Sequence, residues 1–215
     1  MPSSSTHLTT PDTEERNTER TYPTSVGTNR GTLLGIAVRA ASRAPMEVLS
    51  SARISTDHGV GTDFRGKPGR RQVTVLTSSG WRAACSALST DLSWTTRRAN
   101  LFVEGLDLKG KTGYELRIGE AILIITGETR PCQRMDELCP GLLEVLRPDW
   151  RAGVTTQVVR GANVSLGAAV LLDRNVMRYM SVRLRNWVRR NWRRSRQALS
   201  RTLRRHVVKV HPTGQ

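Results

Sequence analysis

The chain has 215 residues, of which 37% are hydrophobic, and a formal net charge of +16 at pH 7. This length suits one domain of ordinary size with additional tails. No stretch of about 18 apolar residues occurs, so the sequence predicts no transmembrane helix. With 3 cysteines, 4 histidines and no C-x-x-C pair, it favours neither a disulfide framework nor a structural zinc site.

The segment 1–30 is rich in Ser, Thr, Pro and charged residues and has no hydrophobic period. Such a composition predicts a disordered N-terminal tail. The segment lacks the apolar stretch of a secretory signal, and its acids are atypical of an organellar transit peptide: Asp12, Glu14, Glu15 and Glu19. We therefore expect a cytoplasmic location.

Short β-branched segments separated by glycine-rich turns follow from residue 31 onward. Their alternation, or a short buried apolar run, predicts strands at 32–38, 46–49, 72–76, 101–103, 121–126 and 154–159. Residues 56–71 form a Gly-rich basic loop, and residues 116–120 resemble a turn. Many short strands with few helices predict a mainly β domain, a barrel or folded sheet, over residues 31–172.

Two helices are predicted inside this domain. The first begins at a cap, Ser78 or Ser79, and continues to about residue 88. The second covers residues 133–146 and is interrupted at Pro140, because proline cannot continue a helix.

A third, basic helix is predicted over residues 173–215. From residue 174 onward the chain has 12 Arg, 1 Lys and no Asp or Glu, whereas the rest of the chain holds 21 basic and 18 acidic residues. Asp173 is the predicted N-cap, and apolar residues recur at helical spacing: Met177, Met180, Leu184, Trp187, Val188, Trp192, Leu199 and Leu203. Packing on the domain is the first interpretation, docking on an anionic membrane surface or a partner protein the second, and nucleic-acid binding the third.

Cys132 is the candidate reactive residue. The predicted strand 121–126 leads into a loop that Pro131 stiffens, and Cys132 comes just before the second predicted helix. Arg130 and Arg134 flank the thiol, and cations beside a thiol near a helix start favour its thiolate form. A thiolate serves as ligand of a soft metal or as nucleophile, while a buried, inert cysteine is the alternative.

Two groups of basic residues are candidates for binding an anion. Arg98 and Asn100 alternate along a predicted extended segment, where they could grip an anion and a polar ring edge. The glycines of loop 56–71 let the backbone approach a ligand, and the loop cations suit phosphate. These cations are Arg65, Lys67, Arg70 and Arg71. Either group alone also fits a solvated surface.

Taken in order, these motifs resemble the MOSC domain, the family named for the C-terminal domain of molybdenum-cofactor sulfurases. The resemblance covers about residues 31–172. It rests on residues 35–38 (GIAV), 59–63 (GVGTD), 71–75 (RQVTV), 97–101 (RRANL), 104–108 (EGLDL) and 118–123 (IGEAIL), and on Pro131 with Cys132. It implies a MOSC-type β-barrel with a few short helices, to which the basic C-terminal helix is added.

The resemblance also implies a molybdenum-cofactor (molybdopterin) site. Cys132 matches the family cysteine that ligates molybdenum through sulfur and would be the catalytic and metal residue. Arg98 and Asn100 match an Arg-x-Asn pair that contacts the pterin, and Arg39 falls where many members place a basic residue. The loop cations would hold the cofactor phosphate: Arg65, Lys67 and Arg71.

Some members reduce N-hydroxylated compounds, so the resemblance implies a molybdenum-dependent oxidoreductase with such a small-molecule substrate. No flavin, haem or iron–sulfur motif is visible, so an external electron-donor protein is expected. The alternative is a carrier of sulfur, as a persulfide on Cys132, or of cofactor, without redox turnover. Pyridoxal phosphate belongs to the fused sulfurase relatives and is not expected to bind here.

Overall fold

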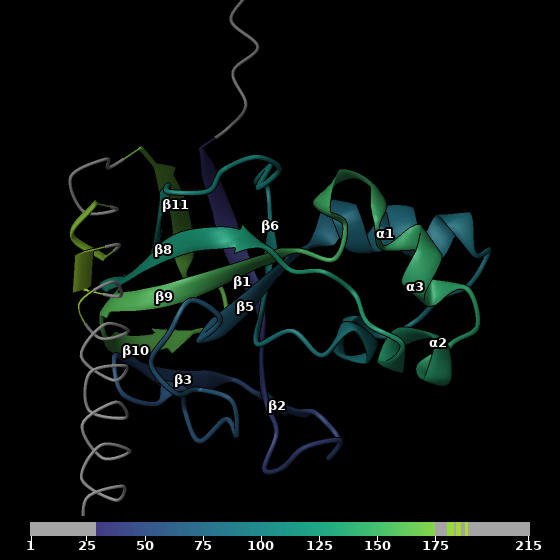
Figure 1. Cartoon of the computed structure of the whole chain (residues 1–215), viewed down its shortest axis with the longest axis horizontal. Coiled ribbons are helices and arrows are strands. Elements are labelled where there is room, and N and C mark those ends of the chain that lie inside the picture. The colour runs from purple at the N-terminus through teal and green to yellow at the C-terminus, as the bar shows by residue number, and fades with distance from the viewer. Residues whose placement is uncertain (1–28, 175–179, 183, 186–187, 189–215) are drawn as a thin grey trace, which may run out of the picture.

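The computed structural model describes residues 29–174, 180–182, 184, 185 and 188 (Figure 1). Over this part the strands are β1 (Arg30–Val38), β2 (Glu47–Leu49), β3 (Ser51–Ser55), β4 (Gly59–Val60), β5 (Val73–Thr77), β6 (Leu101–Glu104), β7 (Glu115–Ile118), β8 (Ala121–Glu128), β9 (Val154–Arg160), β10 (Ala162–Ser165) and β11 (Ala169–Asp173). The helices are α1 (Ser78–Ala87), α2 (Arg134–Leu138) and α3 (Leu142–Val145), with the 3-10 turns η1 (Trp94–Arg97) and η2 (Pro148–Trp150).

Seven strands close into a barrel in the order β1, β6, β5, β9, β8, β7, β11, because β11 pairs with the start of β1. The pairings are antiparallel except for β5 with β6, which is parallel. The strand β2 pairs with the end of β1, and a separate sheet has the order β10, β3, β4. Because the ring is closed, each of its seven strands pairs with a neighbour on both sides.

The alternation of side chains along the strands produces two hydrophobic cores. In β5, Val73 and Val75 lie in the core enclosed by the barrel, whereas Leu76 belongs to the core under the helices. Trp81 of α1 and Leu142 of α3 fill this second core. The three helices gather on one side of the barrel (Figure 1).

The mainly β barrel with few short helices is confirmed. Each predicted strand overlaps an observed one, and the interrupted second helix is observed as α2 and α3. Inside the domain, one predicted turn and one predicted helix cap are wrong. Residues 116–120 are mostly strand β7 of a hairpin with β8, and the cap of α1 is Thr77, whose Oγ1 accepts a hydrogen bond from the N–H of Gly80 at 3.2 Å.

The predicted tail 1–30 and most of the helix predicted over 173–215 lie outside the described residues. Residues 180–182, 184, 185 and 188 are described, and they are helical. Asp173 is the last residue of β11 and Arg174 is not helical, so the prediction that the helix begins at Asp173 as its N-cap is wrong. The domain boundaries at residues 30 and 172 stay predictions. Within the part of the chain that the structure describes, no helix has both the length and the apolarity to cross a membrane.

Candidate functional site

A cleft of about 510 Å³ opens at one edge of the barrel. Four chain segments line it: the end of β1 with the loop behind it, the basic loop with the start of β5, the turn from η1 into β6, and the segment from β8 into α2. The lining residues are Arg39, Ser42, Arg43, Phe64, Arg65, Lys67, Arg71, Gln72, Thr74, Arg97, Arg98, Asn100, Thr129, Arg130, Cys132, Arg134 and Met135.

Strand register explains why three of these segments meet. Leu101, the first residue of β6, stands opposite Ile36 of β1 and Val75 of β5. Because β6 runs antiparallel to β1 and parallel to β5, the end of β1 and the starts of β5 and β6 reach the same edge of the barrel. Asn100 bridges the three strands at this edge. Its Oδ1 accepts from the Thr74 N–H at 3.1 Å, and its Nδ2 donates to the Ala37 oxygen at 3.3 Å.

Asp63 fixes two cations of the cleft through their backbone. Its Oδ1 accepts from the Arg39 N–H and its Oδ2 from the Arg65 N–H, both at 3.0 Å. The carboxylate is buried and holds the basic loop against the end of β1. The backbone of both arginines is therefore held in place. Burial lowers the pKa of Arg39, whereas the negative charge of Asp63 raises it.

Gln72 anchors the other end of the basic loop. Its buried Nε2 donates to the Thr56 oxygen at 2.7 Å and to the Gly66 oxygen at 3.1 Å, while its Oε1 accepts from the Val158 N–H at 3.0 Å. Gly66 is pressed against His58, whose carbonyl oxygen would lie 1.6 Å from an added Cβ. The hydrogen bonds of the Gln72 amide and the close packing of Gly66 thus fix the conformation of the loop.

Gly66→Ala is accordingly expected to lower the free energy of unfolding by about 3 kcal/mol or more, because the backbone at His58 would have to move to admit the methyl group. Chemical denaturation of the purified protein measures this change. Lys67→Ala is the control, since Lys67 is an exposed neighbour in the same loop and should shift the midpoint little. An equal, small effect of both changes would contradict this account of the loop.

The turn before β9 positions the deepest cation and the cysteine segment together. Arg97 donates from Nε to the Ala152 oxygen at 2.9 Å, and the Thr129 N–H donates to the next carbonyl, Gly153, at 2.9 Å. Only glycine fits at 153, where φ is +87° and a Cβ would lie 2.2 Å from the Val75 oxygen. Adjacent carbonyls thereby hold both Arg97 and the start of the segment that carries Cys132, whose side chain is exposed.

The cleft is strongly positive, and no acidic side chain of its lining neutralises the cations. Nine of the 17 residues that line it are Arg or Lys, and none of the 17 is Asp or Glu. Burial lowers the pKa of Arg97 to about 10, with Cys132 raising it and Arg71 lowering it further. Burial, followed by Arg39 and Arg134, also lowers the pKa of Arg98. Neighbouring cations that lower one another's pKa repel each other, and a bound anion would offset this repulsion.

Several buried polar atoms of the cleft have no hydrogen-bond partner. Nη2 of Arg97, Oγ1 of Thr129 and Nε of Arg134 are in this state, and all three residues line the cleft. Arg97 is only 7% exposed and Thr129 only 3%. Unmet donors at a buried site carry a desolvation cost, so the cleft is shaped for a ligand that accepts hydrogen bonds.

One carboxylate lies at the rim. Oε2 of Glu137 pairs with Nη1 of Arg134 at 2.6 Å and with Nη1 of Arg43 at 3.2 Å, so it joins α2 to the loop after β1. The hydrogen bond from Arg134, together with the charge of Arg43, lowers the pKa of Glu137.

The residues predicted for the cofactor site line this one cleft: Arg39, Arg65, Lys67, Arg71, Arg98, Asn100 and Cys132. Arg70, the remaining cation of the basic loop, does not line it, and its Nη2 donates to the Thr126 oxygen at 2.9 Å. The local reasoning for Arg98 was wrong. Arg98 ends η1 in the left-handed region, at φ 63°, so it does not alternate with Asn100 along an extended strand. Its Nη2 donates to the Ala44 oxygen at 2.8 Å, and the Asn100 amide is largely occupied by β1 and β5. Their roles toward a ligand stay predictions.

Sequence reasoning missed Arg97, although the Arg97–Arg98 doublet was visible. Alternation marked only the second arginine as a candidate, whereas the first is buried and has an unpaired donor. Thr129 and Arg43 were also missed. No local pattern distinguishes them, because their place depends on the turn at 152–153 and on the loop after β1.

The barrel domain has known relatives. The family model of the MOSC domain matches residues 56–171, and the chain belongs to the MOSC domain family. This match includes the predicted site residues other than Arg39. MOSC domains are associated with the molybdenum cofactor. Among curated proteins, none matches the sequence.

Solved structures share the fold at low sequence identity. YuaD protein from Bacillus subtilis superposes with a TM-score of 0.61 at 16% identity, over 68% of this chain and 97% of that one. YiiM from Escherichia coli gives 0.52 at 14% identity, over 67% and 73%. YiiM from Geobacillus stearothermophilus gives 0.50 at 13% identity, over 66% and 72%.

Proposed function

We propose that the cleft binds the molybdenum cofactor and that the loaded protein reduces N-hydroxylated compounds. The observation that carries the proposal is the union of one exposed thiol with buried, unpartnered donors in a cleft lined by cations. The donor set fits this group. Among the described residues, no three His, Cys, Asp or Glu side chains come together as a metal site. A metal held at Cys132 must therefore bring most of its ligands with it, as a dithiolene cofactor does.

The thiol and the cations would bind different parts of the cofactor. Cys132 Sγ would bind the metal, because a soft thiolate is its natural protein ligand. The phosphate, a dianion, would lie among the cations of the basic loop, of which Arg65 is held by Asp63. Arg97 and Thr129 would donate to oxygen atoms nearer the cysteine through the groups that now lack partners.

When bound, the molybdenum centre supplies two-electron reduction of an N–O bond. The overall reaction consumes two electrons and two protons, and it converts an N-hydroxylated compound to the amine-level product and water. The chain offers an open approach to Cys132, which is exposed at the cleft. Its unpaired guanidinium donor at Arg97 suits the oxygen that leaves. The electrons come from a partner protein.

Turnover tests this function. Protein produced in a host that makes the cofactor is mixed with reduced viologen dye and a panel of hydroxylamines, amidoximes and N-hydroxylated nucleobases. Formation of the amine or amidine is followed by chromatography. Steady turnover of at least one class supports a reductase, and molybdenum-loaded protein that turns over none of them refutes it.

A persulfide carrier is the second candidate, and the exposure of the Cys132 thiol favours it. In that case a persulfide donor would transfer its outer sulfur atom to Cys132 and leave as a thiol, and mass spectrometry would show the gain of one sulfur atom. Neither bound molybdenum nor turnover would accompany that gain in mass.

A further inference from the structure

The described helical residues near the C-terminus expose large apolar side chains. Met180, Leu184 and Val188 follow one another at intervals of four residues and are 54%, 62% and 51% exposed. Val182 is 1% exposed, and at helical spacing it lies about opposite this row. Among these described residues Val182 is therefore buried while the apolar row stays open, in contrast to an amphipathic helix whose apolar side is covered.

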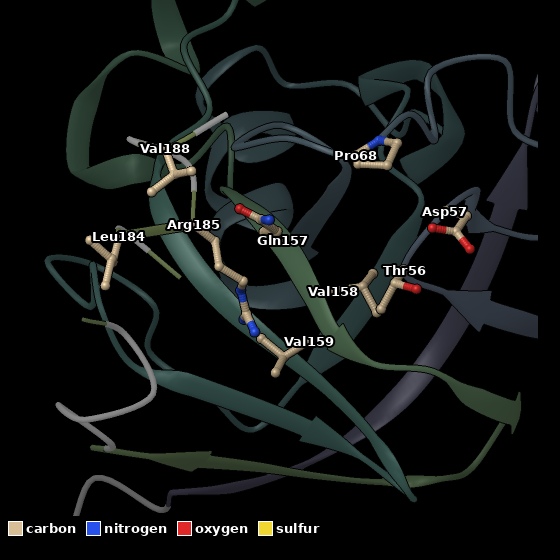
Figure 2. Close-up of a pocket in the computed structure, with 9 residues that line it drawn as sticks. All are labelled: Thr56, Asp57, Pro68, Gln157, Val158, Val159, Leu184, Arg185 and Val188. Atoms are coloured by element: carbon tan, nitrogen blue, oxygen red, sulfur yellow. The ribbon is translucent and has the colours of Figure 1, made fainter. Parts of the chain in front are cut away.

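The row borders a groove of about 570 Å³ on the outside of the barrel. Figure 2 shows Leu184 and Val188 on one side of the groove and Pro68 and Asp57 on the other, with Val158 of β9 between them. Val158 is only 5% exposed and belongs to the barrel core, so Leu184 and Val188 supply most of the exposed apolar surface at the groove. We call the exposed row, together with this groove, the apolar face.

Cations accompany the apolar face. The side chain of Arg185 lines the groove and extends toward Val159 (Figure 2). In the sequence, residues 174–215 hold 12 Arg and 1 Lys and no acid. An apolar surface flanked by positive charge complements a lipid bilayer that has an apolar interior and anionic headgroups.

We propose that the apolar face binds the surface of an anionic phospholipid membrane. Apolar residues such as Leu184 enter the boundary between headgroups and acyl chains, and the arginines bind the lipid phosphates. The helix lies on the membrane and does not cross it. The proposal is independent of the cofactor, since no lining residue of the groove lines the cleft.

The exposed apolar row favours lipid over nucleic acid. A polycation binds nucleic acid through phosphate contacts, and half-exposed Met180, Leu184 and Val188 add nothing to such contacts. On a membrane the same apolar side chains would leave water, and their burial would contribute to binding.

The arrangement also brings the membrane near the cleft. The loop 56–71 contributes Thr56, Asp57 and Pro68 to the groove and Arg65, Lys67 and Arg71 to the cleft. A membrane on the apolar face would therefore lie beside the loop that holds the cleft cations.

Vesicle sedimentation with the full chain tests the proposal. The vesicles contain phosphatidylcholine alone or with about a third of phosphatidylglycerol, at low and high salt. We expect binding to the anionic vesicles only, weakened by salt. The double change L184S/V188S keeps the charge and should weaken this binding at least tenfold. The matched control V48S/L166S removes apolar side chains that are 57% and 43% exposed elsewhere on the barrel, and it should bind as the parent does.

A fluorescent DNA duplex is titrated in parallel. Failure to bind anionic vesicles at low salt overturns the proposal. Equal vesicle binding by L184S/V188S and the parent also overturns it, because charge alone would then suffice. Duplex binding that is tighter than vesicle binding and is unchanged in L184S/V188S would instead assign the tail to nucleic acid. Circular dichroism verifies that both double variants keep the barrel.

Discussion

Cys132→Ser is expected to abolish molybdenum retention while the barrel stays folded. A serine hydroxyl is a hard, protonated group and replaces the thiolate poorly as a ligand of a soft metal. The loss should exceed the roughly 10–100-fold change that follows removal of an outer partner of a metal ligand. Cys132 is exposed, so the change removes no core packing.

Metal analysis of purified Cys132→Ser and parent protein measures this prediction, with thermal unfolding as the check on folding. Cys139→Ser is the matched control, because Cys139 is a half-buried free cysteine of the α2–α3 connection and does not line the cleft. Molybdenum that stays bound to Cys132→Ser, or that is lost equally from Cys139→Ser, would refute the assignment of the metal ligand.

Arg97→Met is expected to weaken cofactor retention at least about tenfold without destabilising the cofactor-free protein. In the parent, the Arg97 guanidinium is buried, and its Nη2 has no partner. Burial lowers the pKa of this group to about 10, which reflects the cost of holding its charge away from water. A bound anion relieves that cost, whereas methionine avoids it and fills similar space.

The change also removes the hydrogen bond to the Ala152 oxygen, which is worth about 1 kcal/mol and is 2.9 Å long in the parent. The two effects oppose each other. We therefore expect the Tm of the cofactor-free protein to fall by no more than about 3 °C, or to rise. Calorimetry and molybdenum analysis of the same preparations test both halves.

Arg147→Met is the control for Arg97→Met, because Arg147 is exposed, pairs with Glu144 and lies outside the cleft. A large drop in the Tm of Arg97→Met with full cofactor retention would show that Arg97 is a structural residue only.

The strands were predictable where the sequence decides them locally. The β-branched run of β8 and the alternation of β9 fix strand and face together, because side chains on a strand alternate. Strand β11 was missed. Its pairing with β1 closes the ring across more than a hundred residues, and no local pattern encodes such a contact.

The candidate site shows the same limit. Residue types and their order predicted one site for Cys132 and three loop cations that do line one cleft, Arg65, Lys67 and Arg71, because the family motifs mark them. The burial of Arg97 rests on a carbonyl 55 residues away, at Ala152, and the left-handed backbone of Arg98 is not a property of its neighbours in sequence. Long-range contacts of this kind decide which of two adjacent arginines has an unpaired donor.

Charge placement separates two regions of the chain. Outside residues 174–215 the protein holds 21 basic and 18 acidic residues, close to balance. Nine of those bases line the cleft. The cationic character of the domain is therefore concentrated where an anionic cofactor would bind, and the charge of the tail is a separate feature.

The central claim is that this cleft holds a molybdenum-bearing anionic cofactor. The most direct test is the molybdenum and pterin content of the full chain, purified from a host that makes the cofactor. The structure predicts near-equimolar molybdenum and pterin, both released when the protein is denatured. Folded protein that carries neither, from cells in which another molybdenum enzyme is fully loaded, would contradict the claim.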